Sequence, residues 1–323
     1  MMKGVGSRGW GSGNGGRNTK HATVCLLLVA IGVAAIGLLT VACGRAPESS
    51  PATASPAEAR LSVVASISPL ADFARQVGGE RVQVTTLIPP GTSPHTYVLT
   101  PVQAVTVSKA HVLVLNGIGL EFWADKVIDA ANNPKLIVVD ASQGIPILAG
   151  DEDETGGNPH VWLNPRHAIR QVERIRDGLI QADPAGRAAY ETNAATYIAS
   201  LEALDADTER LVSDWSQKAF VAFHPSFAYF AQRYGLVQAA VIEAAPGREP
   251  SPTRLADVVS VVREINARAI FAEPQLSPKA AETIATESGV QVLYLDPLGS
   301  RISSRLYTDL IRYNVSQLAQ ALQ

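Results

Sequence analysis

Four side chains that can coordinate a metal ion each follow a predicted strand: His95, His160, His224 and Asp296. The first two lie in the first half of the chain and the other two in the second half. In open α/β sheets, ligands bind at the carboxyl ends of the strands. Each histidine alone would more often be a hydrogen-bonding surface residue, but three imidazoles and a carboxylate at strand ends could together form one metal site.

The remaining histidines and both cysteines are predicted to lie outside such a site. His21 belongs to an N-terminal export signal, His111 opens a buried strand as a structural residue, and His167 lies in the first turn of a surface helix. Cys25 lies within an apolar run and Cys43 at its end, so the exported part has no thiolate. Any metal there must be held by nitrogen and oxygen.

Short apolar runs alternate with helical segments from Leu61 onward, which is typical of α/β folds with parallel sheets. The predicted strands are 61–65, 82–88, 111–115, 135–139, 219–223, 237–243, 269–272 and 290–295. Helices are predicted between most of them, for example over 69–77 and 253–266. Four strands precede residue 150 and four follow residue 218, so we predict two α/β lobes, 61–183 and 218–323.

A single long helix is predicted between the lobes, over 184–217, starting at Asp183-Pro184. Apolar or small residues recur there at steps of three and four, which keeps them on one face: Tyr190, Ala194, Tyr197, Leu201, Leu204, Thr208, Leu211 and Trp215. At 1.5 Å per residue this helix would be roughly 50 Å long. A coiled-coil dimer would need stronger seam residues than Ala194 and Thr208, so we expect a monomer with a stiff link.

The first 43 residues resemble a secretory signal with a lipobox. An uncharged apolar run, 22–42, follows a basic Gly-rich segment and ends at Cys43. Thr40 stands where a lipobox prefers Leu, and the run is also long enough to be a retained membrane anchor. We expect lipid attachment at Cys43, export, and attachment to the outer face of the cytoplasmic membrane or a periplasmic location. The Pro-, Ala- and Ser-rich segment 44–60 is predicted to be a flexible tether.

The charge pattern argues against nucleic-acid binding. The whole chain carries a formal charge of −3, and its first 43 residues contain four basic and no acidic side chains. The exported part is therefore more acidic than the whole, and it has no basic stripe of the kind that nucleic-acid binders carry.

Six segments resemble successive motifs of the zinc- and manganese-binding solute proteins of ABC importers: GTSPHTYVLTP, NPHVWLNP, AFHPSFAYF, REPSP, FAEPQLSP and LDPLGS. The resemblance runs from about residue 61 to the C-terminus, with the motifs in the family's order. It implies two α/β lobes joined by one long helix, with the metal in the cleft between them. It also implies an ABC importer permease as partner.

The same resemblance implies the metal ligands. His95, His160 and Asp296 match three of the family's ligand positions. At the third ligand position manganese-type members often carry glutamate, whereas zinc-type members carry histidine, as this chain does at His224. Three imidazoles and one carboxylate suit Zn²⁺, while Mn²⁺ prefers more oxygen. We therefore expect Zn²⁺, with Mn²⁺ as the alternative.

Two further features can each be interpreted in two ways. Many zinc-type relatives carry a His-rich loop where this chain has an acidic stretch, 151–154, which is either a solvated loop or a weak cation-gathering lip. Glu273 follows a predicted strand and either orients His224 from behind or forms a structural salt bridge with Arg254 or Arg301.

The sequence thus predicts a receptor that binds a transition metal and hands it to an importer, and not an enzyme. A zinc hydrolase is disfavoured because the motif His-Glu-x-x-His is absent and a four-ligand shell leaves no position for an activated water. A receptor for a chelate or cofactor would need aromatic and arginine side chains around its site. An adhesin role has no sequence feature for or against it.

Overall fold

The computed structural model describes residues 60–150, 156–244 and 247–323, all within one compact unit. The predicted signal segment, Cys43, the tether up to residue 59 and the acidic loop 151–154 lie outside these residues. Within the described ranges, no helix combines the length and the apolar character needed to cross a membrane.

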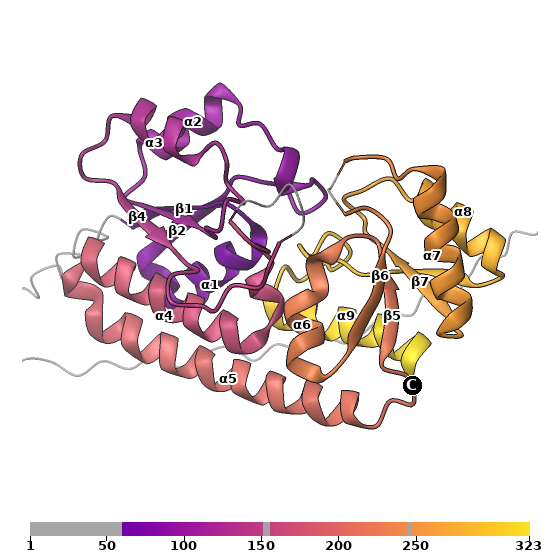
Figure 1. Cartoon of the computed structure of the whole chain (residues 1–323). Coiled ribbons are helices and arrows are strands. Elements are labelled where there is room, and N and C mark those ends of the chain that lie inside the picture. Colours follow the sequence, from indigo (N-terminus) through magenta and orange to yellow (C-terminus); the bar gives the residue numbers. More distant parts are fainter. Residues whose placement is uncertain (1–59, 151–155, 245–246) are drawn as a thin grey trace, which may run out of the picture. The chain divides into compact units, whose positions relative to one another are not determined.

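Two four-stranded parallel sheets form at the positions of the predicted strands (Figure 1). The strands are β1 (Leu61–Ala65), β2 (Val82–Thr86), β3 (Val112–Leu115), β4 (Ile137–Asp140), β5 (Ala219–Ala222), β6 (Val237–Val241), β7 (Ala269–Ala272) and β8 (Gln291–Tyr294). The strand orders, β2-β1-β3-β4 and β6-β5-β7-β8, are equivalent in the two sheets. Every pairing is parallel. The predicted fold of two α/β lobes is confirmed.

Helices cover the sheets, which explains why the inner strands β3 and β7 are apolar along their whole length. They are α1 (Ser68–Gly78), α2 (Pro101–Ser108), α3 (Ala124–Ala131), α4 (Pro165–Ala182), α5 (Arg187–Ser213), α6 (Ala228–Tyr234), α7 (Pro252–Glu264), α8 (Lys279–Ser288) and α9 (Tyr307–Leu322). The inner strands β3 and β7 are buried at every residue, whereas the edge strand β2 alternates between buried and exposed positions. This is the pattern of parallel sheets with both faces covered.

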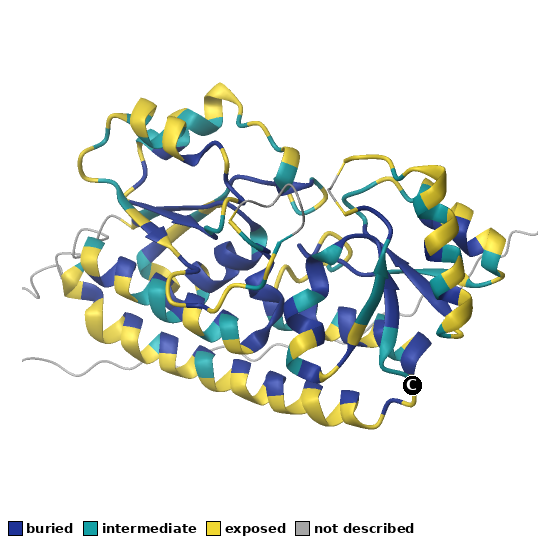
Figure 2. Cartoon of the chain, in the orientation of Figure 1, coloured by how far each residue is buried: buried dark blue, intermediate teal, exposed yellow. Residues whose placement is uncertain are grey.

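The long helix α5 runs along both lobes but is shorter than predicted. Pro184–Gly186 forms a separate 3₁₀ turn, and the α-helix has 27 residues, about 40 Å at 1.5 Å per residue. Its buried stripe faces the lobes and its other side faces solvent (Figure 2). The prediction was wrong at Leu211, which is 53 % exposed, because Val212 takes the buried position one residue later.

A buried carboxylate fastens α5 to helices of both lobes. Asp205 is fully buried and accepts hydrogen bonds from Arg166 (2.6 Å) at the start of α4 and from Arg233 (2.8 Å) and Tyr234 (3.0 Å) on α6. Burial raises the pKa of Asp205, but the hydrogen bonds from Arg233, Tyr234 and Arg166 outweigh this and hold it below its usual value. The carboxylate therefore stays ionised at neutral pH and links the two lobes through α5.

The last helix, α9, returns from the second lobe to contact α1 and α5. At its N-terminus the backbone N–H of Tyr307 donates to Asp72 of α1 (2.8 Å), which also accepts from the hydroxyl of Tyr197 on α5 (3.2 Å). One hydrophobic cluster runs from β1 through α5 to α9, and a second lies between the outer face of the second sheet and helices α7 and α8. The lobes thus share a core.

Replacing Asp205 with Ala should lower the free energy of unfolding by about 3 kcal/mol, because Arg166 and Arg233 would lose their buried partner. Urea unfolding measures the change. Glu209→Ala is the matched control, since Glu209 also accepts hydrogen bonds from Arg233 but is exposed, and it should unfold close to the parent. Equal effects of the two variants would show that Asp205 does not fasten the lobes.

Candidate metal centre

The three histidines predicted as ligands each follow or precede a proline and lie in or next to a short 3₁₀ turn. These turns are Pro94–Thr96, Val161–Leu163 and Pro225–Phe227. His95 lies within the first, and His160 and His224 immediately precede the other two. Proline fixes its own φ near −65°, so each histidine backbone is held in a stiff segment. His95 and His160 come from the first lobe and His224 from the second, at the end of β5.

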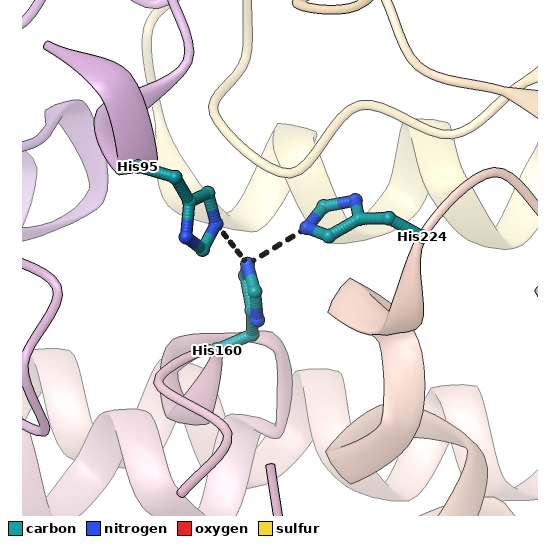
Figure 3. A group of neighbouring side chains, drawn as sticks. All are labelled: His95, His160 and His224. Atoms are coloured by element: carbon teal, nitrogen blue, oxygen red, sulfur yellow. Dashed lines mark hydrogen bonds between the residues drawn. The ribbon is translucent and has the colours of Figure 1, made fainter. Parts of the chain in front are cut away.

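The three imidazoles converge on one point (Figure 3). Nε2 of His160 lies 3.0 Å from Nε2 of His95 and 3.1 Å from Nε2 of His224. One ring nitrogen from each histidine lies within 4.8 Å of those from the other two. His160 and His224 are 1 % and 3 % exposed and His95 is half-buried. Nitrogens bound to one tetrahedral Zn²⁺ at about 2.0–2.1 Å would lie roughly 3.3 Å apart, so the spacing suits a shared ion.

Hydrogen bonds behind two of the rings determine which nitrogen faces the cluster. The amide nitrogen of Asn158 donates to the carbonyl of Pro225 (2.9 Å), so its oxygen must face His160 and accept from Nδ1–H (2.9 Å). Nδ1–H of His224 donates to Glu273 (2.7 Å). Both rings therefore present an Nε2 lone pair to the cluster. Two lone pairs 3.1 Å apart repel each other unless a proton or a metal ion lies between them.

Burial keeps His95 and His160 in the neutral form that binds metal. It lowers the pKa of His95 to about 3, with a further contribution from the nearby His224. The pKa of His160 lies well below its ordinary value, first because of burial and then because of His224 and His95. Neutral imidazole is the metal-binding form, so no proton has to leave these two rings at neutral pH.

The cavity at the cluster is small and mostly apolar. Its volume is about 10 Å³, close to the space that one water molecule needs. Besides the three histidines, its wall includes Trp162, Gln275, Leu276 and Leu298. Trp162 also donates from its indole N–H to the carbonyl of Pro297 (2.8 Å), across the lobes. The free space at the cluster therefore matches a single ion or water molecule.

Asp296, the fourth predicted ligand, is fully buried after β8 but is not part of the cluster. Among the described residues, the close group of metal-ligating atoms consists of the three histidines. The carboxylate of Asp296 accepts hydrogen bonds from Gln275 Nε2 (2.8 Å), from the N–H groups of Leu298 (3.1 Å), Gly299 (3.0 Å) and Arg301 (2.7 Å), and from the hydroxyl of Ser300 (2.9 Å). Its role as a ligand stays a prediction.

Glu273 lies directly behind His224, at the end of β7. It is 2 % exposed, and Oε1 accepts from both His224 and the hydroxyl of Ser226 (2.6 Å). The arginines considered as its alternative partners make other contacts: Arg254 donates to the carbonyl of Val241, and the guanidinium of Arg301 lies 3.6 Å from the ring centre of Tyr294.

The two histidines expected outside the site lie away from the cluster. His111 precedes β3, is exposed, and accepts a hydrogen bond from the N–H of Ser62 (3.0 Å). His167, expected at the surface, is half-buried with its ring 5.3 Å from that of Tyr229. Burial lowers the pKa of His167. The surface expectation failed because α6 of the other lobe packs over the first turn of α4.

Sequence reasoning missed Asn158 and Gln275. Asn158 has a local signal, since the motif Asn-Pro-His places its amide where it can accept from both the backbone N–H (3.0 Å) and the ring of His160. Gln275 has no such signal. Its amide nitrogen contacts Asp296 and the carbonyl of Pro90 (2.7 Å) in the other lobe, and that placement depends on how the lobes meet.

A family model described as zinc-uptake complex component A, periplasmic, matches residues 63–321. The chain belongs to this family. The description names a component of an uptake complex and no enzymatic activity. The match confirms the family that the sequence motifs indicated.

Relatives in this family carry names that refer to different metals. The chain is 34 % identical over 256 residues to the zinc-binding lipoprotein AdcA of Streptococcus pneumoniae, covering 76 % of this chain and 51 % of AdcA. It therefore spans about half the length of that relative. It is 31 % identical to the manganese-binding lipoprotein MntA of Halalkalibacterium halodurans, covering 81 % of this chain and 88 % of MntA. A crystal structure of ZnuA superimposes with a TM-score of 0.74 at 36 % identity, covering 81 % of this chain and 99 % of that one.

Asn158→Ala should weaken metal binding about 10- to 100-fold, because His160 would lose the partner that fixes its tautomer and ring orientation. Titration against a competing chelator measures the change. Asn133→Ala is the control, since Asn133 also donates to backbone carbonyls, those of Ser108 and Ala110, but away from the cavity. An Asn158→Ala protein with parental affinity would show that the tautomer of His160 does not need Asn158.

The metal-free protein should lose stability as the pH falls from about 6.5 toward 3. In this window unfolded His95 binds a proton that folded His95, with its pKa near 3, does not. Each such proton lowers the free energy of unfolding by up to about 1.4 kcal/mol per pH unit. Urea unfolding at several pH values should give a flatter profile for His95→Gln than for the parent. His111→Gln, at an exposed histidine, should keep the parental profile; a parental profile in His95→Gln would contradict the assignment.

Proposed function

We propose that this chain is an extracytoplasmic receptor that captures a divalent transition metal, Zn²⁺ in the first place, and delivers it to an ABC importer permease. The observation that carries the proposal is the convergence of three Nε2 atoms, with two of the rings held from behind by Asn158 and Glu273. A cation placed among these nitrogens would remove the repulsion between the lone pairs of His160 and His224. The metal is the cargo, and His95, His160 and His224 are its proposed ligands.

The chemistry of the donors favours Zn²⁺ over Mn²⁺. Imidazole suits Zn²⁺, whereas Mn²⁺ prefers carboxylate, carbonyl and water. The names of the relatives do not decide the matter, since both a zinc-binding and a manganese-binding lipoprotein match at similar identity. We propose Asp296 as the fourth ligand, which would require it to give up one of its present hydrogen bonds. Cu²⁺ is expected to bind at least as tightly in vitro.

The size of the cavity argues against the rival functions. Three-histidine sites also occur in zinc enzymes that keep a fourth position open, but a cavity of about 10 Å³ suits a single ion better than a metal with a substrate beside it. The same small volume disfavours a chelate or an organic cofactor. We therefore propose binding and release without catalysis.

Delivery requires that the permease separates the lobes, because the proposed ligands come from both. A partner can bias such an opening only if it binds the open form more tightly than the closed one. The shared core around α5 and α9 supports small movements of the lobes over wide hinge opening. We also propose that the protein is a monomer, and that a lipid on Cys43 attaches it to the outer face of the membrane. Metal analysis of protein purified without an affinity tag, followed by competition between Zn²⁺ and Mn²⁺, tests it.

His224→Ala should reduce zinc affinity by about 100-fold or more, because a three-nitrogen site would lose one of its ligands. His224→Glu should shift preference toward Mn²⁺ by adding an oxygen ligand. Calorimetric titration with both ions measures each change, and thermal unfolding checks that the variants fold.

His111→Ala is the control for both variants, since His111 is exposed and lies outside the cluster. His167→Ala is less suitable, because His167 contacts Tyr229, whose hydroxyl donates to the carbonyl of Asn158 (2.8 Å). Zinc binding by His224→Ala at the parental affinity would exclude this cluster as the metal site.

A further inference from the structure

Gln275 lies between the metal cavity and Asp296. It forms part of the cavity wall together with the three histidines, whereas Asp296 does not. Its Nε2 donates to Oδ1 of Asp296 (2.8 Å) and to the carbonyl of Pro90 in the first lobe (2.7 Å). The side chain thus connects three parts of the site: the cavity, the carboxylate behind it and the opposite lobe.

The orientation of this amide is fixed by its partners. A carboxylate and a backbone carbonyl can only accept hydrogen bonds here, so the nitrogen must face both of them. The amide oxygen then points away from Asp296. Oε1 of Gln275 is buried and has no hydrogen-bond partner among the described residues. A buried acceptor without a partner costs about 1–3 kcal/mol, and a cation in the adjoining cavity, or water bound to that cation, would supply the partner.

The hydrogen bond from Gln275 also occupies an acceptor direction of Asp296. Oδ1 already accepts from the backbone N–H groups of Leu298 and Gly299, which hold the loop after β8. The third donor, Gln275, is the one whose side chain belongs to the cavity wall. Its partly positive N–H therefore lies on the side of Oδ1 from which a metal ion would have to approach.

We infer that Gln275 sets the metal preference of the site by competing with the ion for Oδ1 of Asp296, the proposed fourth ligand. This inference rests on the proposed function. With Gln275 in place, the ion has to displace an N–H group before Asp296 can bind it, so the three imidazoles dominate the site, which suits Zn²⁺. Without it, Oδ1 of Asp296 can turn to the ion and supply the charged oxygen that Mn²⁺ prefers. Because Gln275 also holds Pro90, its displacement would loosen a contact between the lobes.

The test compares Zn²⁺ and Mn²⁺ affinities, measured by chelator competition, in the parent, Gln275→Leu and Gln275→Ala. Both variants should raise the affinity for Mn²⁺ relative to Zn²⁺ by about tenfold, the effect of one charge-assisted interaction. The gain should depend on Asp296. In Gln275→Leu/Asp296→Asn the ratio should return to that of Asp296→Asn alone, since the pair forms one double-mutant cycle.

Ser300→Ala is the matched control, because it also removes a donor from the carboxylate of Asp296, but on Oδ2 and outside the cavity wall. Its metal ratio should stay within about twofold of the parent, on the scale where tenfold is 1.4 kcal/mol. An unchanged ratio in both folded Gln275 variants, or a gain that persists in the double variant, overturns the inference and leaves the proposed function standing. A parent that binds neither ion overturns both.

Discussion

The site depends on keeping lone pairs of neutral imidazoles about 3 Å apart in a nearly dry cavity. Such an arrangement repels itself and would relax if the rings could turn or the lobes could drift apart. Two restraints prevent this. Asn158 and Glu273 hold the far nitrogens of His160 and His224, and prolines at each turn stiffen the backbone that carries the rings. The ligands are therefore ordered before the ion arrives, so that binding costs little additional conformational entropy, as expected for a preorganised site.

The same requirement explains the polar contacts far from the metal. A cluster drawn from two lobes keeps its geometry only if the lobes are fixed to each other. Asp205 joins α4 and α6 through α5, and Asp72 joins α1 to α5 and to the start of α9. Buried carboxylates are expensive to desolvate, and here both are placed where elements of different lobes meet. The long helix α5 thus holds the two lobes at fixed positions, through hydrogen bonds at several points along its length.

The sequence was sufficient for the fold and for most of the site because both follow from local patterns. Strands that are buried on both faces are apolar throughout, as in β3 and β7, and can be recognised by that pattern. His224 directly follows such a strand, so its place at the carboxyl end of the sheet could also be predicted. Where the sequence failed, side-chain directions decided the outcome. Val212 replaces Leu211 in the buried stripe of α5, since a step of three or four allows either residue, and His167 is covered by a helix that is distant in the chain. Gln275 could not be found at all, because its contacts join Pro90, Asp296 and the cavity, which come together only in three dimensions.

Charge balance gives a reason for the two carboxyl side chains near the ion, Glu273 in the cavity wall and Asp296 next to it. A divalent ion held by three neutral imidazoles in an apolar pocket would leave two positive charges poorly solvated, which is costly unless negative groups are close. Glu273 lies behind His224, and Asp296 lies behind Gln275. Glu273 can compensate the ion through its hydrogen bond to His224, and Asp296 can do so as the proposed fourth ligand once it releases Gln275. Placing charge in the layer behind nitrogen ligands retains the preference for nitrogen-seeking ions, while the electrostatic cost of burying the ion is still met. Moving Glu273 into the shell as well would exchange that selectivity for a harder, more oxygen-rich shell.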